Sequence, residues 1–402
     1  MNPPCVFRGQ LILPDRIERG MLLVRDGKCA EISHQEAEIP ADLPVIDVGD
    51  SYISPGFIDL HVHGGDGSDF MDGTAAAFQN ALQAHARHGT TRLAVTTTVA
   101  THSQILATLE LTRQFRKTPL PNAARVLGAH FYGPYFRYEA RGAHPGGPIR
   151  PPVADEFLQY LAYADDLVTA TIAPEVDGAM EFALACREQG VRTNVGHSWA
   201  TFAQMREAIA WGVRHVDHLF CAMSDKGKLR QFQMYPMQGG VLEATLYFDE
   251  LTTEVIADGK HLDAGLLQLA LKIKGPDRLA LVTDCNRALD MPDGPYMMGP
   301  NDGGEPVFRQ DNVGVMPNKS SLASSVMGMD HMVRTFQRLT ERPLWEVVRM
   351  ASLTPARIAG QDAYLGSLER GKQADLLVLD KELNIQRAFI DGEELKFAPL
   401  VR

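Results

Sequence analysis

The chain has 402 residues, 45% of them hydrophobic and 22% charged, values typical of a globular protein large enough for a barrel with an accessory domain. Its formal net charge of −11, with no run of Lys and Arg, excludes an extended nucleic-acid-binding surface, although a few local cations could still bind an anionic ligand. The five cysteines show no CxxC spacing and are too few for a disulfide scaffold, which indicates a reducing compartment.

The first residues and the longest apolar runs bear on the location of the protein. Met1-Asn2-Pro3-Pro4-Cys5 lacks the basic region and apolar stretch of a signal peptide. No uninterrupted apolar run approaches the ~18 residues that a membrane-spanning helix needs. We therefore expect a cytoplasmic protein without a membrane partner.

Both ends of the chain are predicted to form short β-strands. Asp26-Gly27 between two apolar runs is typical of a hairpin turn. Similar runs return near the C-terminus, so we predict one small β-sandwich domain assembled from residues 1–54 and 365–402. The runs are Leu11–Leu13, Met21–Val24, Ala374–Asp380 and Ile385–Ile390.

Residues 55–364 alternate between apolar runs and helical patterns. Eight strand signals alternating with helices predict the α/β class, as a (β/α)8 barrel, with an open doubly wound sheet as the alternative. Gly294–Asn318 is rich in Gly and Pro and is expected to be an active-site loop or a hairpin excursion. The strand signals lie near 56–63, 92–99, 126–132, 168–173, 192–197, 213–219, 253–257 and 279–284, and helical patterns cover Thr74–His88, Ala200–Gly212, Asp263–Lys274 and Ser324–Leu339.

Two histidines separated by one residue follow the first of these runs. On a strand, His61 and His63 point to the same face, here the barrel interior at its C-terminal mouth. Two imidazoles at this spacing can bind one divalent metal. A bare His-x-His is more often a surface or hydrogen-bonded pair, but the flanking Pro55-Gly56 and Gly64-Gly65 favour a metal site.

Three more polar residues each close a predicted strand. His197, His218 and Asp284 would often be structural if they stood alone, the aspartate as a helix cap. Together with His61 and His63 they indicate a metal centre in which Asp284 takes a proton from water. A divalent metal can lower the pKa of a water molecule from about 16 to about 7.

Nine segments in order along almost the whole chain carry a resemblance to a known family. The chain resembles the amidohydrolase superfamily and, within it, the N-acetylglucosamine-6-phosphate deacetylases and the similar N-acetylgalactosamine-6-phosphate enzymes. The segments are Pro55–Gly65, Gly142–Pro145, Ala173–Glu175, Gly196–Ser198, His218–Met223, Ile256–His261, Val282–Asp284, Leu353–Arg357 and Gly366–Asp375.

The resemblance implies a fold, an activity and a set of roles. It implies a (β/α)8 barrel with a small β-sandwich, a homodimer, and hydrolysis of the acetamide of a phosphorylated amino sugar. It implies that His197 and His218 bind a metal, and that His61 and His63 do so in members that use that site. Asp284 would be the general base that later protonates the leaving amine.

The sugar-phosphate pocket implied by the resemblance departs in part from the family. His144, His261 and the backbone of Cys221-Ala222 would contact the substrate. The family usually has an asparagine at the position of Cys221, and it has an Arg-Glu-Pro-Gly segment that this chain lacks. The basic stretch 225–230 keeps positive charge there, so Arg230 is the candidate phosphate contact, with a solvated basic loop as the alternative.

One position also departs from the family's metal site. The family usually has a glutamate ligand where this chain has Tyr132, and a tyrosine is a poor zinc ligand while its pKa stays near 10. The loss of an anionic ligand favours one metal over two, with zinc preferred to iron or another divalent ion. The expected ligands are His61, His63, His197 and Asp284, with His218 nearby.

Other side chains could replace the missing ligand. Glu175, at the end of the fourth predicted strand, is the main alternative, and Glu139 on a following loop is a weaker one. Cys285 should point away from the metal, and Cys221 is expected to pack against its neighbours. An odd separation from the next ligand should turn His215 outward.

The sequence therefore predicts a metal-dependent carbohydrate N-deacetylase, with N-acetylglucosamine 6-phosphate as the favoured substrate. One alternative is a mononuclear amidohydrolase acting on another N-acyl compound or on a cyclic amide or amine. A third hypothesis is a degenerate member that binds sugar phosphate without turnover. The presence of four histidines and Asp284 argues against the third, since an inactive site has no chemical need of them.

Overall fold

Eight parallel strands form the central sheet in the computed structural model, which describes residues 3–35 and 43–397. The strands neighbour one another in chain order, as a (β/α)8 barrel requires. The first and last strands meet through backbone hydrogen bonds, including Asp284 N to His61 O at 2.8 Å, so the sheet is nearly closed. The strands are β5 (Phe57–Val62), β8 (Thr90–Thr96), β9 (Arg125–Phe131), β10 (Leu167–Ile172), β11 (Arg192–Val195), β12 (His215–Val216), β13 (Thr252–Ile256) and β14 (Leu279–Val282).

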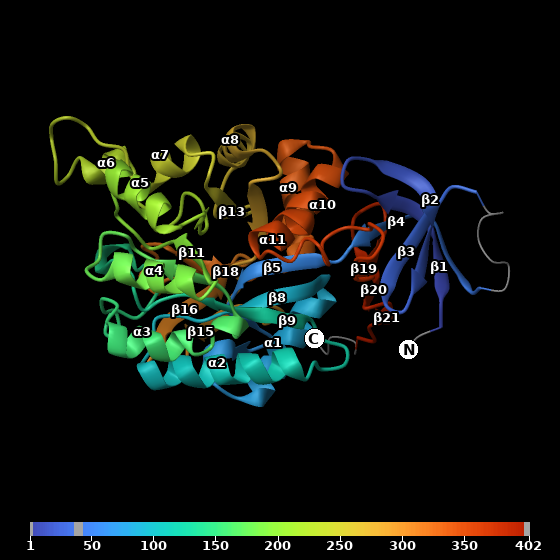
Figure 1. Cartoon of the computed structure of the whole chain (residues 1–402), viewed down its shortest axis with the longest axis horizontal. Coiled ribbons are helices and arrows are strands. Elements are labelled where there is room, and N and C mark those ends of the chain that lie inside the picture. The colour runs from blue at the N-terminus through green and yellow to red at the C-terminus, as the bar shows by residue number, and fades with distance from the viewer. Residues whose placement is uncertain (1–2, 36–42, 398–402) are drawn as a thin grey trace.

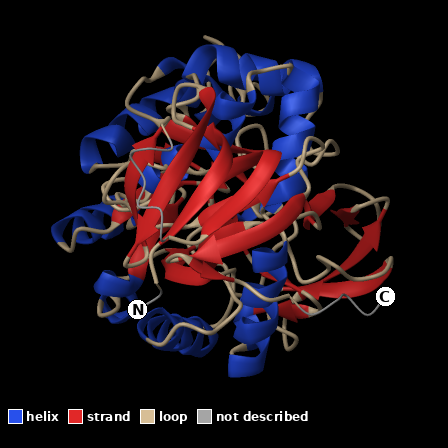
Figure 2. Cartoon of the chain, turned by 90° about the vertical axis from the view of Figure 1, so that its right-hand side faces the viewer, coloured by secondary structure: helices blue, strands red, loops and turns tan. Residues whose placement is uncertain are grey.

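Helices surround the barrel and cover its strands (Figure 2). Several begin where the sequence supplies a cap: Thr74, Thr101, Thr201 and Asp263 each accept the backbone N–H three residues on. None of the helices in the described ranges has the length and apolar character needed to cross a membrane. The helices are α1 (Ala75–Arg87), α2 (His102–Lys117), α3 (Ala154–Leu161), α4 (Ala179–Glu188), α5 (Phe202–Trp211), α6 (Lys226–Leu229), α7 (Val241–Tyr247), α8 (Ala264–Lys274), α9 (Met329–Thr340), α10 (Leu344–Ala351) and α11 (Leu353–Ile358).

Strands from both ends of the chain form a separate sheet beside the barrel (Figure 1). The predicted hairpin turn is confirmed, with positive φ at Asp26 and Gly27. The sheet has a hydrophobic core of its own, in which the ring centroids of Phe7 and Phe389 lie 4.8 Å apart. Its order is β21 (Glu393–Glu394), β20 (Ile385–Ile390), β19 (Leu376–Leu379), β4 (Val45–Pro55), β1 (Cys5–Ile12), β2 (Ile17–Arg25) and β3 (Lys28–Ser33).

A β domain built from both termini is thus confirmed, while its predicted boundaries stay a prediction, and residues 1–2, 36–42 and 398–402 lie outside the described chain. Arg92 of β8 links this domain to the barrel. Its guanidinium lies 2.6 Å from Asp375 and 2.7 Å from Asp391, two carboxylates of the β domain.

The Gly/Pro-rich segment after β14 forms hairpins. β15 (Gly294–Met298), β16 (Glu305–Gln310), β17 (Val313–Val315) and β18 (Leu322–Ser325) make a four-stranded antiparallel sheet. The helix predicted over Ser324–Leu339 is wrong at its start, because Ser324 has φ 64°, which a right-handed helix cannot contain, and α9 begins only at Met329. A further pair, β6 (Gly64–Gly65) and β7 (Ser68–Asp69), follows β5.

Candidate active site

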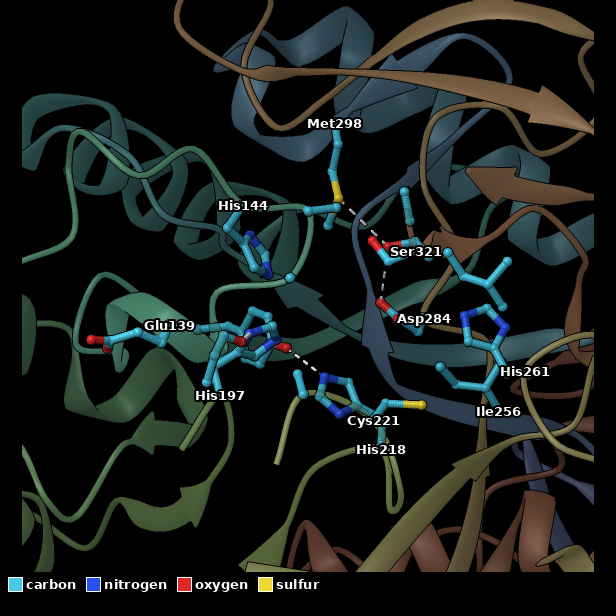
Figure 3. A pocket seen from close by; sticks show the side chains of 18 of the residues that line it. Glu139, His144, His197, His218, Cys221, Ile256, His261, Asp284, Met298 and Ser321 are labelled. Atoms are coloured by element: carbon cyan, nitrogen blue, oxygen red, sulfur yellow. Dashed lines mark hydrogen bonds between the residues drawn. The ribbon is translucent and has the colours of Figure 1, made fainter. Parts of the chain in front are cut away.

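The predicted metal and catalytic residues lie at the ends of the barrel strands, and Figure 3 shows His197, His218 and Asp284 of this set around one cavity. His61 belongs to the end of β5, and the others follow the ends of their strands. In parallel barrels this face carries the active site. The side chains and their strands are His61 and His63 with β5, Tyr132 with β9, His197 with β11, His218 with β12 and Asp284 with β14.

A cavity of about 400 Å³ opens over these side chains. Of the predicted substrate contacts, Arg230 is exposed and does not line it, whereas Lys228 does, with its Nζ donating to Met223 O at 2.6 Å. His61 and His63 are buried and are not among the residues that line the cavity. The lining residues include Tyr132, His144, His197, Trp199, His218, Cys221, Ala222, Lys228, His261, Asp284, Met298 and Ser324.

Three of the predicted site residues have a left-handed backbone. The φ angles are 48° at His197, 23° at His218 and 47° at Asp284. A non-glycine residue in this region costs roughly 1–3 kcal/mol, and such strain concentrates at functional sites. Each residue lies two positions beyond the end of a barrel strand, and the unusual backbone there turns its side chain toward the cavity.

His61, His63 and Asp284 form a group whose potential ligand atoms all lie within 4.8 Å of one another. Oδ1 of Asp284 is 3.3 Å from Nε2 of His63 and 3.7 Å from Nε2 of His61. Nε2 of His61 and both ring nitrogens of His63 are buried without a hydrogen-bond partner in the described residues. Buried nitrogens are rarely left unpaired, and two imidazoles with a carboxylate suit a divalent metal, so these residues fit such an ion.

Glu254 of β13 orients His61 from behind. Nδ1–H of His61 donates to its Oε1 at 2.6 Å, so Nε2 is left to face Asp284. Burial disfavours the charged form of His61 and so lowers its pKa, but the nearby carboxylates of Glu254 and Asp284 have the larger effect. The pKa of His61 is therefore raised to about 9. For Glu254 the same attraction overcomes burial and holds its pKa well below the ordinary value.

The contacts of Glu254 also show where the sequence-based expectation for His215 is wrong. Nε2 of His215 lies 3.1 Å from its Oε2, and both side chains are buried. The prediction that His215 faces outward is therefore wrong, because strand β12 ends at Val216 and the left-handed backbone at His218 breaks the alternation of side chains on which the prediction relied. The sequence did carry a signal for Glu254, a lone charged residue inside the buried run Thr252–Ile256.

A second group of close acidic and imidazole atoms comprises His61, Asp217 and Glu254. Its carboxylates are already hydrogen-bonded. Asp217 accepts from Thr171 Oγ1 at 2.6 Å and from Asn194 Nδ2 at 2.9 Å. This group supports the first as a buried network, and it has less need of an ion.

Asp284 remains a carboxylate despite its burial. Burial raises the pKa of Asp284, but the attraction of His61, His63 and His218 lowers it by a larger amount. The pKa of Asp284 is therefore about 2. Ser324 Oγ lies 3.4 Å from Oδ1, and the same oxygen faces the histidines. An ionised carboxylate at the cavity wall can hold a cation or accept a proton.

Tyr132 stands among the histidines of the site and borders the cavity. Its ring centroid lies 4.6 Å from that of His61 and 5.3 Å from that of His197. Its hydroxyl is 2.7 Å from Nε2 of His218. Burial, followed by the nearby carboxylates, raises the pKa of Tyr132 well above 10, so it is a neutral phenol and not an anionic ligand.

His197 and His218 are neutral imidazoles on the cavity wall. Burial lowers the pKa of His218 to about 4 and that of His197 well below its ordinary value, and neighbouring histidines add to both shifts. Nδ1–H of His197 donates to Ala140 O at 2.7 Å, which leaves Nε2 as an acceptor. Neither histidine belongs to either group of close potential ligand atoms that contains His61. The ring centroids of His197 and His218 are 5.2 Å apart.

The alternative ligands lie elsewhere. Glu175 accepts from Ser198 Oγ at 2.7 Å and from the backbone N–H of Trp199, and it belongs to neither group of potential ligands in the described residues. Glu139 lines the cavity but pairs with Arg137. Burial raises the pKa of Cys221 to about 12, so its thiol is protonated.

The chain is similar to proteins of known name along nearly all its length. Its sequence matches the amidohydrolase family over residues 52–395. It is 33% identical over 395 residues to the N-acetylgalactosamine-6-phosphate deacetylase of Escherichia coli O157:H7, covering 98% of this chain and 99% of that protein. It is 30% identical to the N-acetylglucosamine-6-phosphate deacetylase of Vibrio furnissii, covering 96% and 94%.

Solved structures give the same picture of the fold. The chain superposes on N-acetylglucosamine-6-phosphate deacetylase from Pasteurella multocida with a TM-score of 0.89 and 27% identity, covering 98% of this chain and 99% of that one. A mutant of the Mycobacterium smegmatis enzyme, in complex with N-acetyl-D-glucosamine-6-phosphate, gives a TM-score of 0.88 at 27% identity, with coverage of 98% and 100%.

Proposed function

This chain belongs to the amidohydrolase family, and we propose that it hydrolyses the acetamide of an N-acetyl-hexosamine 6-phosphate, with N-acetylglucosamine 6-phosphate as the favoured substrate. The observation that carries the proposal is the group of His61, His63 and Asp284 beside a cavity that Asp284 lines, with buried ring nitrogens of the two histidines that have no partner in the described residues. Relatives named as deacetylases of both hexosamine epimers match the chain over nearly its full length.

A single divalent metal, zinc in preference to iron, fits this group. His61 and His63 would hold it through Nε2, with Asp284 as the anionic partner. His197 lies outside this group of close atoms, but its Nε2 is left as an acceptor because Nδ1 donates to Ala140, and it is the candidate fourth ligand. The metal, when bound, supplies an acidified water molecule and polarises the substrate carbonyl.

Asp284 carries the proton in the proposed reaction. Because its carboxylate is ionised and faces the cavity, it can take a proton from the water that adds to the acetyl carbon. The C–N bond then breaks, acetate leaves, and Asp284 returns the proton to the amine nitrogen of the sugar. No net proton is stored on the protein after one cycle.

Substrate orientation falls to the polar residues around the cavity. His144, His261 and Lys228 line it, and Lys228 supplies a positive charge suited to the 6-phosphate. The pKa of His144 lies well below its ordinary value because of burial and the nearby histidines, so it would contact the substrate as a neutral imidazole. Cys221 and Ala222 also line the cavity and offer backbone groups.

We also propose a homodimer that covers the segment after α6. This segment exposes Phe232, Met234, Tyr235 and Met237, each to at least 50% of its surface, close behind the exposed Arg230. Large apolar side chains exposed at such close spacing along one segment are typical of an interaction site. In a dimer, Arg230 could serve the partner's cavity, which would explain its distance from its own.

A substrate panel tests the proposed function. Acetate release should be measured for N-acetylglucosamine 6-phosphate, N-acetylgalactosamine 6-phosphate and unphosphorylated N-acetylglucosamine, with the metal content of the protein determined in parallel. We expect turnover of the 6-phosphates, a much lower kcat/KM without the phosphate, and about one metal per chain. Full metal occupancy without acetate from any of the three would refute the proposal and favour another amide or amine substrate.

A further inference from the structure

Tyr132 is fixed rigidly at the edge of the cavity. Its backbone N–H donates to Thr97 Oγ1 at 2.8 Å, and its carbonyl accepts from the same hydroxyl at 3.1 Å. Its ring packs against Phe136, His61 and His197, with centroids within 5.3 Å. The side chain is almost fully buried yet borders the cavity, so its hydroxyl group has a set position there.

The hydrogen bond between Tyr132 and His218 has a preferred direction. Nδ1 of His218 is buried without a partner in the described residues, so a proton placed there would leave an unpaired N–H. A proton on Nε2 is instead donated to the Tyr132 oxygen at 2.7 Å, and only a lone pair is left unpaired. An unpaired donor is the rarer and costlier of the two.

With His218 as the donor, the hydroxyl hydrogen of Tyr132 is free. The part of the chain that the structure describes gives that hydroxyl one polar partner, His218, and no acceptor besides it. The hydroxyl therefore has a donor to offer to a molecule in the cavity, which Asp284 also lines.

We propose that Tyr132 is a catalytic residue whose hydroxyl donates a hydrogen bond to the acetyl oxygen of the substrate while negative charge develops on it. The inference rests on the proposed deacetylase function. Water adds to the acetyl carbon, the C–N bond breaks, and Asp284 moves the proton from water to amine. Tyr132 keeps its own proton throughout, and its raised pKa agrees with that.

A fixed donor of this kind favours the transition state over the bound substrate. Preorganised donors aimed at a developing oxyanion act strongly where water is excluded, and removal of one costs about 10²–10³ in kcat. A tyrosine that only fills space would leave kcat unchanged when its oxygen alone is removed. The Tyr132→Phe substitution separates these roles, because the ring stays.

The test compares metal-loaded wild type, Tyr132→Phe and the matched control Tyr135→Phe. Tyr135 is equally buried on the same segment, but its hydroxyl donates to Glu156 at 2.8 Å, outside the cavity. The readouts are kcat and KM for acetate release, metal content, and calorimetric affinity for two ligands. One ligand is the amino-sugar 6-phosphate product, and the other is a methylphosphonamidate analogue with a tetrahedral anionic centre.

For Tyr132→Phe we expect kcat and analogue affinity to fall together by about 10²–10³, with product affinity, KM and metal content near wild-type values. Tyr135→Phe should match wild type throughout. Unchanged kcat and analogue affinity in Tyr132→Phe would overturn the inference, as would a parallel loss of product affinity or of metal. A wild type that releases no acetate yet binds the analogue through Tyr132 would refute only the proposed function, and absence of all binding would refute both.

Discussion

Replacing Glu254 with Gln should change how metal binding depends on pH. The carboxylate lies 2.6 Å from Nδ1 of His61, and both side chains are buried. Carboxylates behind a ligating histidine typically strengthen metal binding 10–100-fold, about 1.4–2.7 kcal/mol. Gln keeps the shape and an oxygen acceptor but removes the charge.

The same charge also holds a proton that the metal must displace. With the pKa of His61 at about 9, the imidazole is protonated at pH 7 in the metal-free protein. Displacing that proton costs about 1.36 kcal/mol for each pH unit below the pKa, or about 100-fold in affinity at pH 7. Wild-type affinity should therefore rise about 100-fold between pH 7 and pH 9, whereas the variant, with a lower pKa at His61, should rise far less.

Competition with a chelator across this pH range measures both effects. At pH 9 the Glu254→Gln protein should bind metal about 10–100-fold more weakly than wild type, and the gap should narrow toward pH 7. Glu346→Gln is the matched control, since Glu346 is buried in α10 and pairs with Arg342, away from the site. Identical affinity and identical pH dependence in Glu254→Gln and wild type would refute the role assigned to this carboxylate.

Further predictions address the pocket, the metal count and the scaffold. Lys228→Ala removes one charge-assisted contact from the cavity. In steady-state assays it should lower kcat/KM about 10–100-fold for phosphorylated substrates and leave kcat/KM for the unphosphorylated sugar unchanged. Tyr132→Glu should bind metal more tightly, since a carboxylate replaces the phenol, and elemental analysis that shows no gain would contradict this. The pKa of His88 is raised to about 9, because its hydrogen bonds to Asp290 and Asp330 outweigh burial. It should therefore contribute about 3 kcal/mol of stability below pH 6.5, lost as pH rises through 9. The difference in unfolding free energy between wild type and His88→Gln, measured in urea, should shrink as the pH rises from 6.5 through 9. A difference that stays constant with pH would contradict this role of His88.

The barrel could be predicted because each buried parallel strand is a continuous apolar run and the loops between them contain amphipathic helices. The side chains that close those runs, such as His197 and Asp284, were predictable for the same reason, since parallel strands end on one face. Their left-handed backbone was not, because histidine and aspartate are enriched at positive φ but most residues of either type still adopt other conformations.

Details of the site that depend on packing between distant strands were beyond the sequence. Glu254 reaches His61 only because the barrel nearly closes, and no local spacing encodes that contact. Lys228 and Arg230 are two residues apart in a short helical turn, so the sequence could not decide which of them lines the cavity. The pairing of Tyr132 with His218 likewise joins two strands that are far apart along the chain.

The most direct test of the central claim is the amount of acetate and of free amine formed from N-acetylglucosamine 6-phosphate by metal-loaded wild type and by Asp284→Asn. We predict that wild type forms the two products in equal amounts. The variant, which keeps its size but cannot accept the proton, should show kcat lower by about 10²–10⁴. Wild type that forms no acetate, or an Asp284→Asn protein as active as wild type, would contradict the account.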